Sequence, residues 1–495
     1  MLPSPRADLK ANTLDYEVLP LVKPTGFREY DARWIFEQEI NLLGIQALGQ
    51  GLGTLIREMN KEPRIVVGHD FRGYSASIKQ ALTVGLMSAG LEVNDIGLAL
   101  SPVAYFAQFD LDIPCVAMVT ASHNENGWTG VKMGAARPLT FGPDEMGRLK
   151  EIVLNGEYKS FDGGAYRYVD GMRERYIADV TEGVSFKRKM KVIAACGNGT
   201  AGAYAPEALE RLGLDVVPMD AELDHTFPRY NPNPEDMEML HAMQTAVKEN
   251  GADVALGFDG DGDRCGVVDN EGEEIFADKI GVMIARDLSA IHDKAQFVVD
   301  VKSTGLFMTD PVLVENEAET VYWKTGHSYI KRKSHELGAL AGFEKSGHFF
   351  FNEPIGRGYD DGLVAAIALL QMLDRNPDKN LSDLRKALPI TYQSPTMSPH
   401  CPDEEKYGVV EKVVAELSSR KEIIGQKVRD VVTVNGVRIT AEDGTWGLVR
   451  ASSNKPELVV VVESPTSKEN MKAMFDELDA ELKKHPEVGA YNQKI

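Results

Sequence analysis

Apolar and polar positions along the chain follow two periods, and together they predict strands and helices in alternation. The β-branched runs 64–70, 116–119 and 191–196 have the length and content of buried strands. Between such runs lie amphipathic stretches, including 77–89 and 203–212, that predict helices. Strands that alternate with helices pair mostly in parallel, and such sheets bind ligands at the carboxyl ends of their strands.

The pattern recurs three times along the first four fifths of the chain. Each round ends with an apolar run followed by a polar loop, at 116–119, 253–258 and 340–343. The first round also contains a long helical pattern, which we place at 35–59. We therefore expect three similar α/β domains with mixed, mostly parallel sheets.

The last part of the chain has a different pattern. Residues 428–439 and 445–462 alternate as antiparallel strands do, and 467–484 form an amphipathic helix after a linker at 391–402 rich in Pro and Ser. This predicts a smaller C-terminal α+β domain. The expected domain boundaries are 1–175, 176–283, 284–392 and 393–495.

The charge balance restricts the kinds of partner that the chain is expected to bind. The 495 residues include 54 basic and 75 acidic side chains, for a net charge of −21. This balance argues against a nucleic-acid partner or an anionic membrane surface, so an anionic ligand would need locally clustered cations. No apolar stretch has the length of a membrane helix. The cysteines are scattered without a CxxC pair, which predicts a reducing compartment, the cytoplasm.

Four loops could carry chemistry, and the first is 120–134. Ser122, His123 and Lys132 place a hydroxyl, an imidazole and an amine on a loop that leaves a strand. This arrangement is compatible with a covalent nucleophile, although Ser, Asn and Gly also favour turns for backbone reasons alone.

The second loop contains Asp259, Asp261 and Asp263, separated by glycines and followed by Arg264. Three carboxylates at alternating positions can hold one hard cation through oxygen ligands. An EF-hand fails here, because its sixth position would be Arg264 and its twelfth Asn270. A guanidinium beside the acids suits a metal that is shared with a phosphate.

Two further loops contain polar groups at strand ends. The segment 344–348 has a carboxylate, an amine, a hydroxyl and an imidazole, which suit sugar hydroxyls and proton transfer. The segment 450–456 could hold a phosphate by guanidinium, hydroxyl and backbone N–H groups. Each is also compatible with an ordinary hairpin turn.

A rival motif is the GxGxxG sequence at 197–202, which follows a predicted strand and precedes a helix. Asp220 lies after the next strand, so a nicotinamide-dependent dehydrogenase is an alternative. That alternative leaves the loops around Ser122 and Asp259 unexplained.

With all four loops in this order, the chain resembles the α-D-phosphohexomutase superfamily, and most closely its phosphomannomutase/phosphoglucomutase branch. The resemblance runs from the segment 27–31 to the loop 450–456 and implies four domains around a central cleft. It implies reversible conversion of a hexose 1-phosphate and a hexose 6-phosphate of mannose or glucose. The phosphoryl group would pass through phosphorylated Ser122 and a hexose 1,6-bisphosphate that also serves as activator. A phosphosugar is the expected small-molecule partner of a monomer or dimer.

The resemblance also implies roles for individual residues. Ser122, Asp259, Asp261 and Asp263 would bind Mg²⁺, and Lys132 and Arg264 would lie beside the transferring phosphoryl group. The other implied catalytic or substrate-binding residues are His123, His348, Arg28, Glu344, Lys345, Ser346, Lys302, His327, Arg450, Ser452, Ser453 and Asn454.

Three positions depart from the family pattern. Trp34 replaces a usual Gly, Glu125 stands where many relatives have Pro, and Lys345 replaces a frequent Met at a position that tracks sugar preference. A phosphoglucosamine-type mutase and a sugar-phosphate binder without turnover therefore stay open as alternatives.

Overall fold

The structure is a computed structural model that describes residues 10, 13–453, 455–493 and 495. The chain forms two compact units. Unit 1 comprises Met1–Ala277 with Ser346–Ser382, and unit 2 comprises Asp278–Lys345 with Asp383–Ile495.

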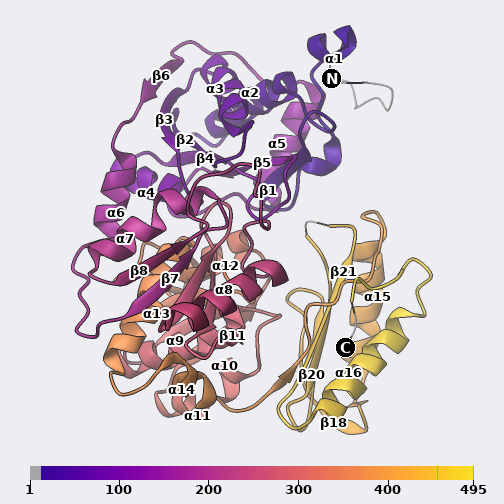
Figure 1. Cartoon of the computed structure of the whole chain (residues 1–495). Coiled ribbons are helices and arrows are strands. Elements are labelled where there is room, and N and C mark those ends of the chain that lie inside the picture. The colour runs from indigo at the N-terminus through magenta and orange to yellow at the C-terminus, as the bar shows by residue number, and fades with distance from the viewer. Residues whose placement is uncertain (1–9, 11–12, 454, 494) are drawn as a thin grey trace. The chain divides into compact units, whose positions relative to one another are not determined.

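The first sheet of unit 1 has six strands in the order β1-β5-β4-β2-β3-β6 (Figure 1). Strands β4, β2, β3 and β6 pair in parallel, whereas β5 pairs antiparallel with both β4 and β1. Their bounds are β1 Asp31–Ile35, β2 Arg64–His69, β3 Glu92–Leu98, β4 Cys115–Val119, β5 Trp128–Gly134 and β6 Ala165–Tyr168.

The second sheet of unit 1 has the order β11-β10-β9-β7-β8, with β7, β8 and β9 parallel. Its strands are β7 Lys191–Ala195, β8 Asp215–Met219, β9 Val254–Phe258, β10 Cys265–Asp269 and β11 Glu274–Ile275, and β15 Phe349–Phe351 also belongs to unit 1.

Helices cover the strands of unit 1. One hydrophobic cluster joins the first sheet to α2, α3 and α5, and α4 packs against β2 and β4. The helices are α1 Leu14–Val18, α2 Leu42–Glu58, α3 Ser75–Ser88, α4 Ser101–Asp110, α5 Pro143–Asn155, α6 Met172–Thr181, α7 Ala205–Arg211, α8 Met237–Asn250 and α13 Gly362–Arg375, with 3₁₀ turns η1 Pro24–Gly26 and η2 Thr200–Ala203.

Unit 2 contains a third α/β sheet, in which β12 pairs in parallel with both β13 and β14. Its elements are β12 Gln296–Asp300, β13 Glu319–Trp323, β14 Ala341–Phe343, α10 Leu306–Thr309, α11 Pro311–Glu315 and α12 His327–Leu337. The chain passes between the units within α9 Ala277–Ile291, between Lys345 and Ser346, and within α14 Leu381–Lys386.

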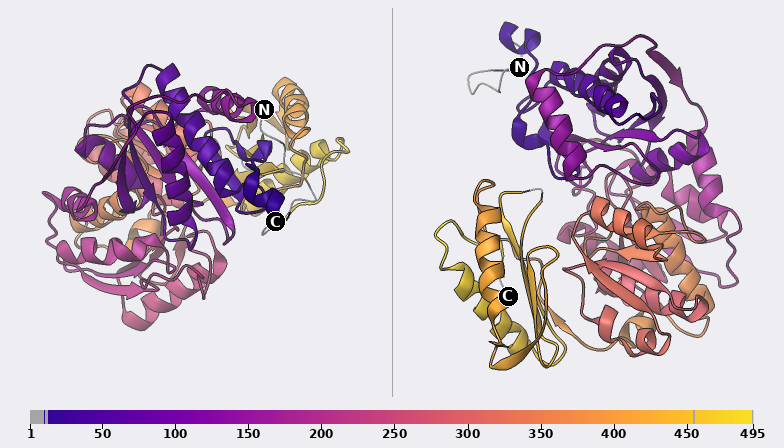
Figure 2. Two further views of the ribbon diagram at one scale, coloured as in Figure 1. Left: turned by 90° about the horizontal axis from the view of Figure 1, so that it is seen from above. Right: turned by 180° about the vertical axis from the view of Figure 1, so that it is seen from behind.

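The C-terminal sheet of unit 2 is antiparallel, in the order β16-β21-β20-β19-β18-β17. Its two helices share one hydrophobic cluster with the sheet and cover one face (Figures 1 and 2). The elements are β16 Tyr392–Gln393, β17 Glu422–Ile423, β18 Gln426–Val432, β19 Val437–Ala441, β20 Trp446–Ala451, β21 Leu458–Ser464, α15 Lys406–Ser419 and α16 Lys468–Leu482.

The expected fold class is confirmed, since three α/β sheets precede an antiparallel domain. The helix expected at 35–59 is wrong at its start, because 31–35 form strand β1 and the helix begins at Leu42. Asn41 caps it by accepting a bond of 2.8 Å from the Gly44 N–H. Lys132 was expected on a loop and instead lies in strand β5.

The fold accommodates Trp34 at the position in the first motif where the family usually has Gly. Its indole is buried, lies edge-on to Phe27 with 5.2 Å between ring centroids, and donates a 2.8 Å bond to the Lys23 carbonyl. A Cβ at Gly26 would meet the indole at 1.9 Å, so Gly26 makes room for this bulky side chain.

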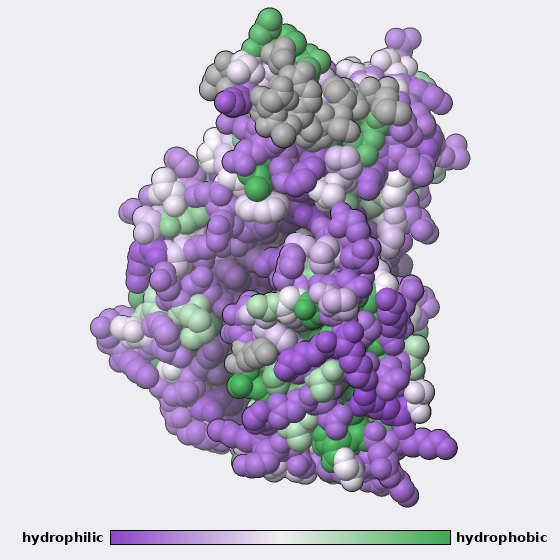
Figure 3. Space-filling model, turned by 90° about the vertical axis from the view of Figure 1, so that its right-hand side faces the viewer, coloured by the Kyte–Doolittle hydropathy of each residue, from purple (hydrophilic) through white to green (hydrophobic). Residues whose placement is uncertain are grey.

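The surface drawn in Figure 3 is predominantly hydrophilic, with apolar residues in small scattered groups. Within the part of the chain that the structure describes, no helix combines the length and the apolar character that crossing a bilayer requires.

Candidate active site

The serine loop and the aspartate loop meet in unit 1. Ser122 Oγ lies 2.9 Å from Asp259 Oδ2, to which it donates, and 3.2 Å from Nδ1 of His123. Ser122 is buried and adopts a left-handed φ of 52°. Burial, reinforced by Arg264, holds the pKa of His123 well below its usual range, so this imidazole is neutral at pH 7.

Asp259, Asp261 and Asp263 lie after β9 and are fully buried. Each places one carboxylate oxygen within 4.8 Å of the other two. Lys132 donates a 2.7 Å bond to Asp261 and also bonds Asp263, and its register opposite Met118 of β4 fixes that position. The predicted Lys132 and carboxylates are therefore brought together.

The electrostatics of this cluster favour a bound cation. Burial, together with Asp261 and Asp263, raises the pKa of Asp259 to about 8. Burial acts in the same direction on Asp261, but Lys132 outweighs it and holds the pKa of that carboxyl below its usual range. Oδ1 of Asp261 and Oδ1 of Asp263 have no hydrogen-bond partner among the described residues. Three buried carboxylates with oxygens still free to coordinate fit a hard divalent ion such as Mg²⁺.

The close approach of the two loops depends on Gly260. A Cβ at this position would meet the Ser122 carbonyl oxygen at 2.5 Å. Asp261, the residue after Gly260, accepts a 2.6 Å bond at Oδ2 from Ser101 at the start of α4. Ser101 was not found from the sequence, because it precedes Asp261 by 160 residues.

Arg264 and His348 form a second pair in unit 1. Arg264 Nε donates a 3.0 Å bond to His348 Nε2, while His348 Nδ1 lies 3.1 Å from Asp360 Oδ2 and 3.6 Å from Asp263 Oδ1. Burial lowers the pKa of His348, but Asp263 and Asp360 outweigh it and raise that pKa. The arrangement leaves Nε2 as the accepting nitrogen of a strengthened base.

Arg33 is a further cation near the cluster that the sequence analysis did not single out. Its Nε and Nη2 each lie 2.9 Å from Asp31 Oδ2, and its Nη1 is buried without a hydrogen-bond partner among the described residues. Burial lowers the pKa of Arg33, but Asp31 and then Asp261 outweigh it and raise that pKa. The sequence signal that could have identified Arg33 is the period of two in β1, which places Asp31 and Arg33 on one face. Asp31 lies opposite Lys132 in the sheet. The predicted Arg28 precedes this strand, where its N–H bonds the Asp31 carbonyl at 2.9 Å.

Unit 2 gathers four of the predicted residues at the ends of β12, β13 and β14. Lys302 Nζ lies 3.7 Å from Asp300 Oδ2, and the Lys345 N–H bonds Asp300 Oδ1 at 3.3 Å. Glu344 accepts a bond from the Gly326 N–H, next to His327. Asp300, which the sequence analysis missed, is thus a buried acceptor among these groups.

Lys345 is one of the three residues that depart from the family pattern. Its Nζ is 4.0 Å from Asp278 Oδ2, and burial, only partly offset by Asp278, lowers its pKa. Glu344 and Lys345 belong to unit 2, whereas Ser346 and His348 belong to unit 1.

The phosphate-loop candidates lie at the end of β20 and beyond. Arg450 is buried in the strand itself, donates from Nη1 to the Ala451 carbonyl at 2.6 Å, and leaves Nε without a partner among the described residues. Ser452 and Ser453 are also buried. Asn454 lies outside the described residues.

Protein atoms occupy the space next to the glycines of the motif at 197–202. A Cβ at Gly202 would meet the Ala221 carbonyl at 2.1 Å, and one at Gly197 would meet Pro232 at 2.8 Å. Asp220, the acidic residue that the dinucleotide alternative would need after the next strand, accepts bonds from Arg229. The motif therefore permits close loop packing, and the dehydrogenase alternative loses its support.

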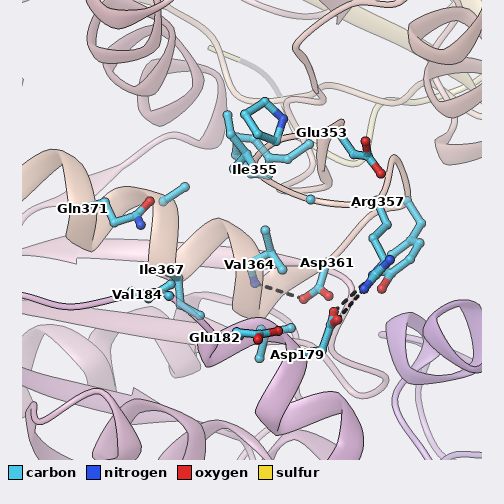
Figure 4. Close-up of a pocket in the computed structure, with 17 residues that line it drawn as sticks. Asp179, Glu182, Val184, Glu353, Ile355, Arg357, Asp361, Val364, Ile367 and Gln371 are labelled. Atoms are coloured by element: carbon cyan, nitrogen blue, oxygen red, sulfur yellow. Dashed lines mark hydrogen bonds and ion pairs between the residues drawn. The ribbon is translucent and has the colours of Figure 1, made fainter. Parts of the chain in front are cut away.

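A separate cavity of about 560 Å³ lies in unit 1 between the end of α6 and the segment 351–371 (Figure 4). Arg357 spans it to Asp179, and Asp361 at its wall caps α13 through the Val364 N–H. None of the residues predicted for the site lines this cavity.

Comparisons with known proteins agree with this geometry. Four models of the phosphoglucomutase/phosphomannomutase family match in order: alpha/beta/alpha domain I at 24–160, domain II at 167–272, domain III at 276–392 and the C-terminal domain at 401–481. A "Phosphomannomutase/phosphoglucomutase" of Pseudomonas syringae pv. tomato is 34% identical over 94% of this chain and 97% of its own length. That of Pseudomonas aeruginosa PAO1 is 33% identical over 91% of this chain and 94% of its own.

Solved structures give the same result. A phosphoglucomutase/phosphomannomutase family protein from Burkholderia thailandensis superposes with a TM-score of 0.84 at 28% identity, and covers 94% of this chain and 98% of its own. Sequence and structure together place this chain in the phosphoglucomutase/phosphomannomutase family.

Proposed function

We propose that this protein interconverts hexose 1-phosphates and hexose 6-phosphates of mannose or glucose through phosphorylated Ser122 and a hexose 1,6-bisphosphate. The observation that carries the proposal is the 2.9 Å contact between Ser122 Oγ and Asp259, inside a cluster of three buried carboxylates. A hydroxyl held against such a cluster suits phosphoryl transfer, which needs positioning and charge neutralisation above all.

Asp259, Asp261 and Asp263 would hold Mg²⁺ together with an oxygen of the phosphorylated Ser122. The ion would neutralise charge on the transferring group. Lys132 contributes fixed positive charge rather than a proton: burial lowers its pKa, but Asp261 and Asp263 together outweigh burial and hold that pKa well above the usual range.

His348 is the better candidate for proton movement. In the forward half-reaction the phosphorus–oxygen bond to Ser122 breaks as a bond to the sugar hydroxyl forms, and Nε2 of His348 would take the hydroxyl proton once the hydrogen bond from Arg264 Nε to that nitrogen is released. The 3.0 Å bond from Arg264 marks Nε2 as an acceptor, and Asp360 orients the ring from the other nitrogen. Nη1 of Arg33, which has no hydrogen-bond partner among the described residues, would donate to a phosphate oxygen.

The proposed substrate-binding residues belong to unit 2, except Ser346, which belongs to unit 1. Glu344 and Ser346 would hold sugar hydroxyls, with Lys302, His327 and Lys345 nearby. The phosphate that is not transferred would lie against the cationic and hydroxyl groups of the last domain, Arg450, Ser452, Ser453 and Asn454. Clustered cations of this kind let a chain of net charge −21 bind a dianion.

A phosphoglucosamine-type activity is the second candidate. A "Probable phosphoglucosamine mutase" of Methanothermobacter thermautotrophicus is 28% identical over 90% of this chain, and Lys345 departs from the residue frequent in mannose and glucose enzymes. Side-by-side isomerisation of glucose, mannose and glucosamine phosphates, with trace bisphosphate, separates the two.

The decisive experiment combines intact mass with turnover. After incubation with a hexose 1,6-bisphosphate, the wild type should gain one phosphate that maps to Ser122 and should isomerise the sugar phosphate. Ser122→Ala should fold normally, gain no phosphate and lose nearly all turnover. Ser88→Ala, which removes a surface hydroxyl bonded only to its own helix at 2.8 Å, is the control. Full activity in Ser122→Ala would refute the assignment.

We also propose four domains with boundaries near 1–175, 176–283, 284–392 and 393–495, and the four successive family matches support their number and order. A cytoplasmic location is proposed because all four cysteines are free and buried.

A further inference from the structure

The turn after β2, residues 70–72, contacts the serine loop from two sides, and on one side the contact is made by the buried guanidinium of Arg72. Arg72 Nη2 donates to the carbonyl oxygens of Ser122 at 2.8 Å and Asn124 at 2.7 Å, and Nη1 donates to that of Glu125 at 3.1 Å. The Arg72 side chain is only 2% exposed. Three carbonyl groups of the loop thus converge on one permanent positive charge.

Asp70 holds the other side of the same loop. Its Oδ2 accepts bonds from the Thr120 hydroxyl at 2.9 Å and the Ala121 N–H at 3.2 Å, and it pairs with Arg72 Nε at 3.2 Å. The Thr120 hydroxyl in turn accepts the Ser122 N–H at 2.9 Å. Every residue from 120 to 122 is therefore tied to the Asp70–Arg72 pair, directly or through one neighbour.

This bonding matters because Ser122 has a strained backbone. A left-handed φ of 52° is unfavourable for a non-glycine residue when nothing else supports it. The bonds from Arg72 and Asp70 offset that cost, and they fix the conformation in which Oγ faces Asp259.

The turn is itself tied to the aspartate loop. The Thr200 hydroxyl accepts the Phe71 N–H at 2.9 Å, and the Thr200 N–H bonds the Gly260 carbonyl at 3.3 Å. The glycine motif at 197–202, which the function otherwise leaves unused, brings Thr200 into this place.

We infer that Arg72 and Asp70 are positioning residues that hold Ser122 in its reactive orientation, and that Thr200 keeps them in register with the aspartate loop. We call these three residues the serine clamp. The inference rests on the proposed function, because it assigns the clamp to the step in which Ser122 exchanges its phosphoryl group.

Arg57 provides a matched control in the same domain. Like Arg72 it binds loop carbonyls, those of Ala89 at 2.9 Å and Gly90 at 2.8 Å, but within the described residues it makes no hydrogen bond to the serine loop. The variants are Arg72→Lys, Arg72→Gln, Thr200→Val and Arg57→Gln. Their kcat and KM are measured per folded molecule, and amide hydrogen exchange is followed in residues 120–126.

For Arg72→Gln we expect kcat to fall about 10- to 100-fold, because a small displacement of a nucleophile has effects of that size. KM for the hexose 1-phosphate should stay within about twofold, since Arg72 is not proposed to touch the sugar. Arg72→Lys should recover part of kcat, and Thr200→Val should lose less than Arg72→Gln. Exchange in residues 120–126 should accelerate in both Arg72 variants and stay unchanged in Arg57→Gln.

The outcomes separate the two hypotheses. If the wild type neither isomerises hexose phosphates nor phosphorylates Ser122, the proposed function is wrong, and hydrogen exchange still decides the clamp. If the wild type turns over and Arg72→Gln matches Arg57→Gln in kcat and exchange, the clamp is wrong. Should Arg72→Gln fail to fold, Arg72→Lys and Thr200→Val apply the same criteria.

Discussion

Arg33 is held by Asp31 through two of its nitrogens, and the third is directed away from that pair. A guanidinium anchored in this way presents a donor at a fixed place, which a flexible ammonium cannot do. Its influence on the site extends to Asp261, which contributes to the raised pKa of Arg33.

We therefore predict that Arg33→Lys lowers kcat/KM about 10- to 100-fold, because a charge-assisted hydrogen bond to a phosphate contributes about 1.5–3 kcal/mol. The measurement is steady-state turnover of a hexose 1-phosphate. The control is Arg64→Lys in β2, where the arginine pairs at 3.1 Å with the partly exposed Glu62 and should be dispensable. An unchanged kcat/KM in Arg33→Lys would remove Arg33 from the site.

Single residues were predictable from the sequence where their chemistry is local. Ser122 and His123 are adjacent, and the three aspartates lie within five residues, so spacing alone grouped them. Ser101, Arg72 and Asp300 were missed because their roles come from contacts across the fold. Ordinary residue types at strand and helix ends carry no local signal of such contacts.

At the scale of elements, the serine and aspartate loops can lie close together because Gly260 has no side chain. Gly260 does not adopt a positive φ, so backbone freedom is not the reason for glycine here. The reason is the Ser122 carbonyl, which a Cβ would approach to 2.5 Å.

Gly260→Ala should consequently separate the two loops and lower kcat by at least about tenfold, since backbone atoms on both sides must shift. Mutase turnover at saturating substrate measures this effect. Gly147→Ala in α5 is the control, because its Cβ would meet nothing within 4 Å. That variant should be stabilised by about 1 kcal/mol and keep wild-type kcat. Equal kcat in the two variants would contradict the packing argument.

Most elements were predictable because their apolar periods are strong, and the antiparallel C-terminal strands are an example. Strand β1 was not, because 31–35 includes the charged residues Asp31 and Arg33, which pair with each other in the fold. The helix pattern that follows was therefore extended too far toward the N-terminus, past the Asn41 cap.

At the scale of the whole molecule, the order of four loops predicted the order of domains, but not the division into compact units. That division falls inside the segment 344–348. On the unit 1 side of this division His348 contacts Arg264 and Asp360, and no sequence pattern reveals these contacts.

Unit 2 has its own buried charge centre at Glu463 in β21. One oxygen accepts from the Gly305 N–H at 2.8 Å and the Trp446 indole at 3.1 Å, and the other pairs with Lys279 at 3.0 Å. Burial raises the pKa of Glu463, but Lys279 and these hydrogen bonds outweigh it and lower that pKa to about 2. The carboxylate thus joins the C-terminal sheet to the α/β part of the same unit.

A carboxyl group whose pKa falls on folding stabilises the fold above its unfolded pKa, near 4.3, and loses that effect as the pH drops toward 2. We predict that, between pH 5 and pH 2, the free energy of unfolding of the wild type falls by about 3 kcal/mol more than that of Glu463→Gln. Urea titrations followed by tryptophan fluorescence measure this, because Trp446 contacts Glu463 directly.

Other carboxyl groups also titrate in this range, so the test is the difference between variants. Glu477→Gln is the matched control: Glu477 is 43% exposed and pairs with Arg420 at 3.1 Å, and exposed pairs contribute little to stability. It should follow the pH dependence of the wild type. If Glu463→Gln follows it as well, Glu463 titrates alike in the folded and unfolded chains, and the acid sensitivity of unit 2 must come from other carboxyl groups.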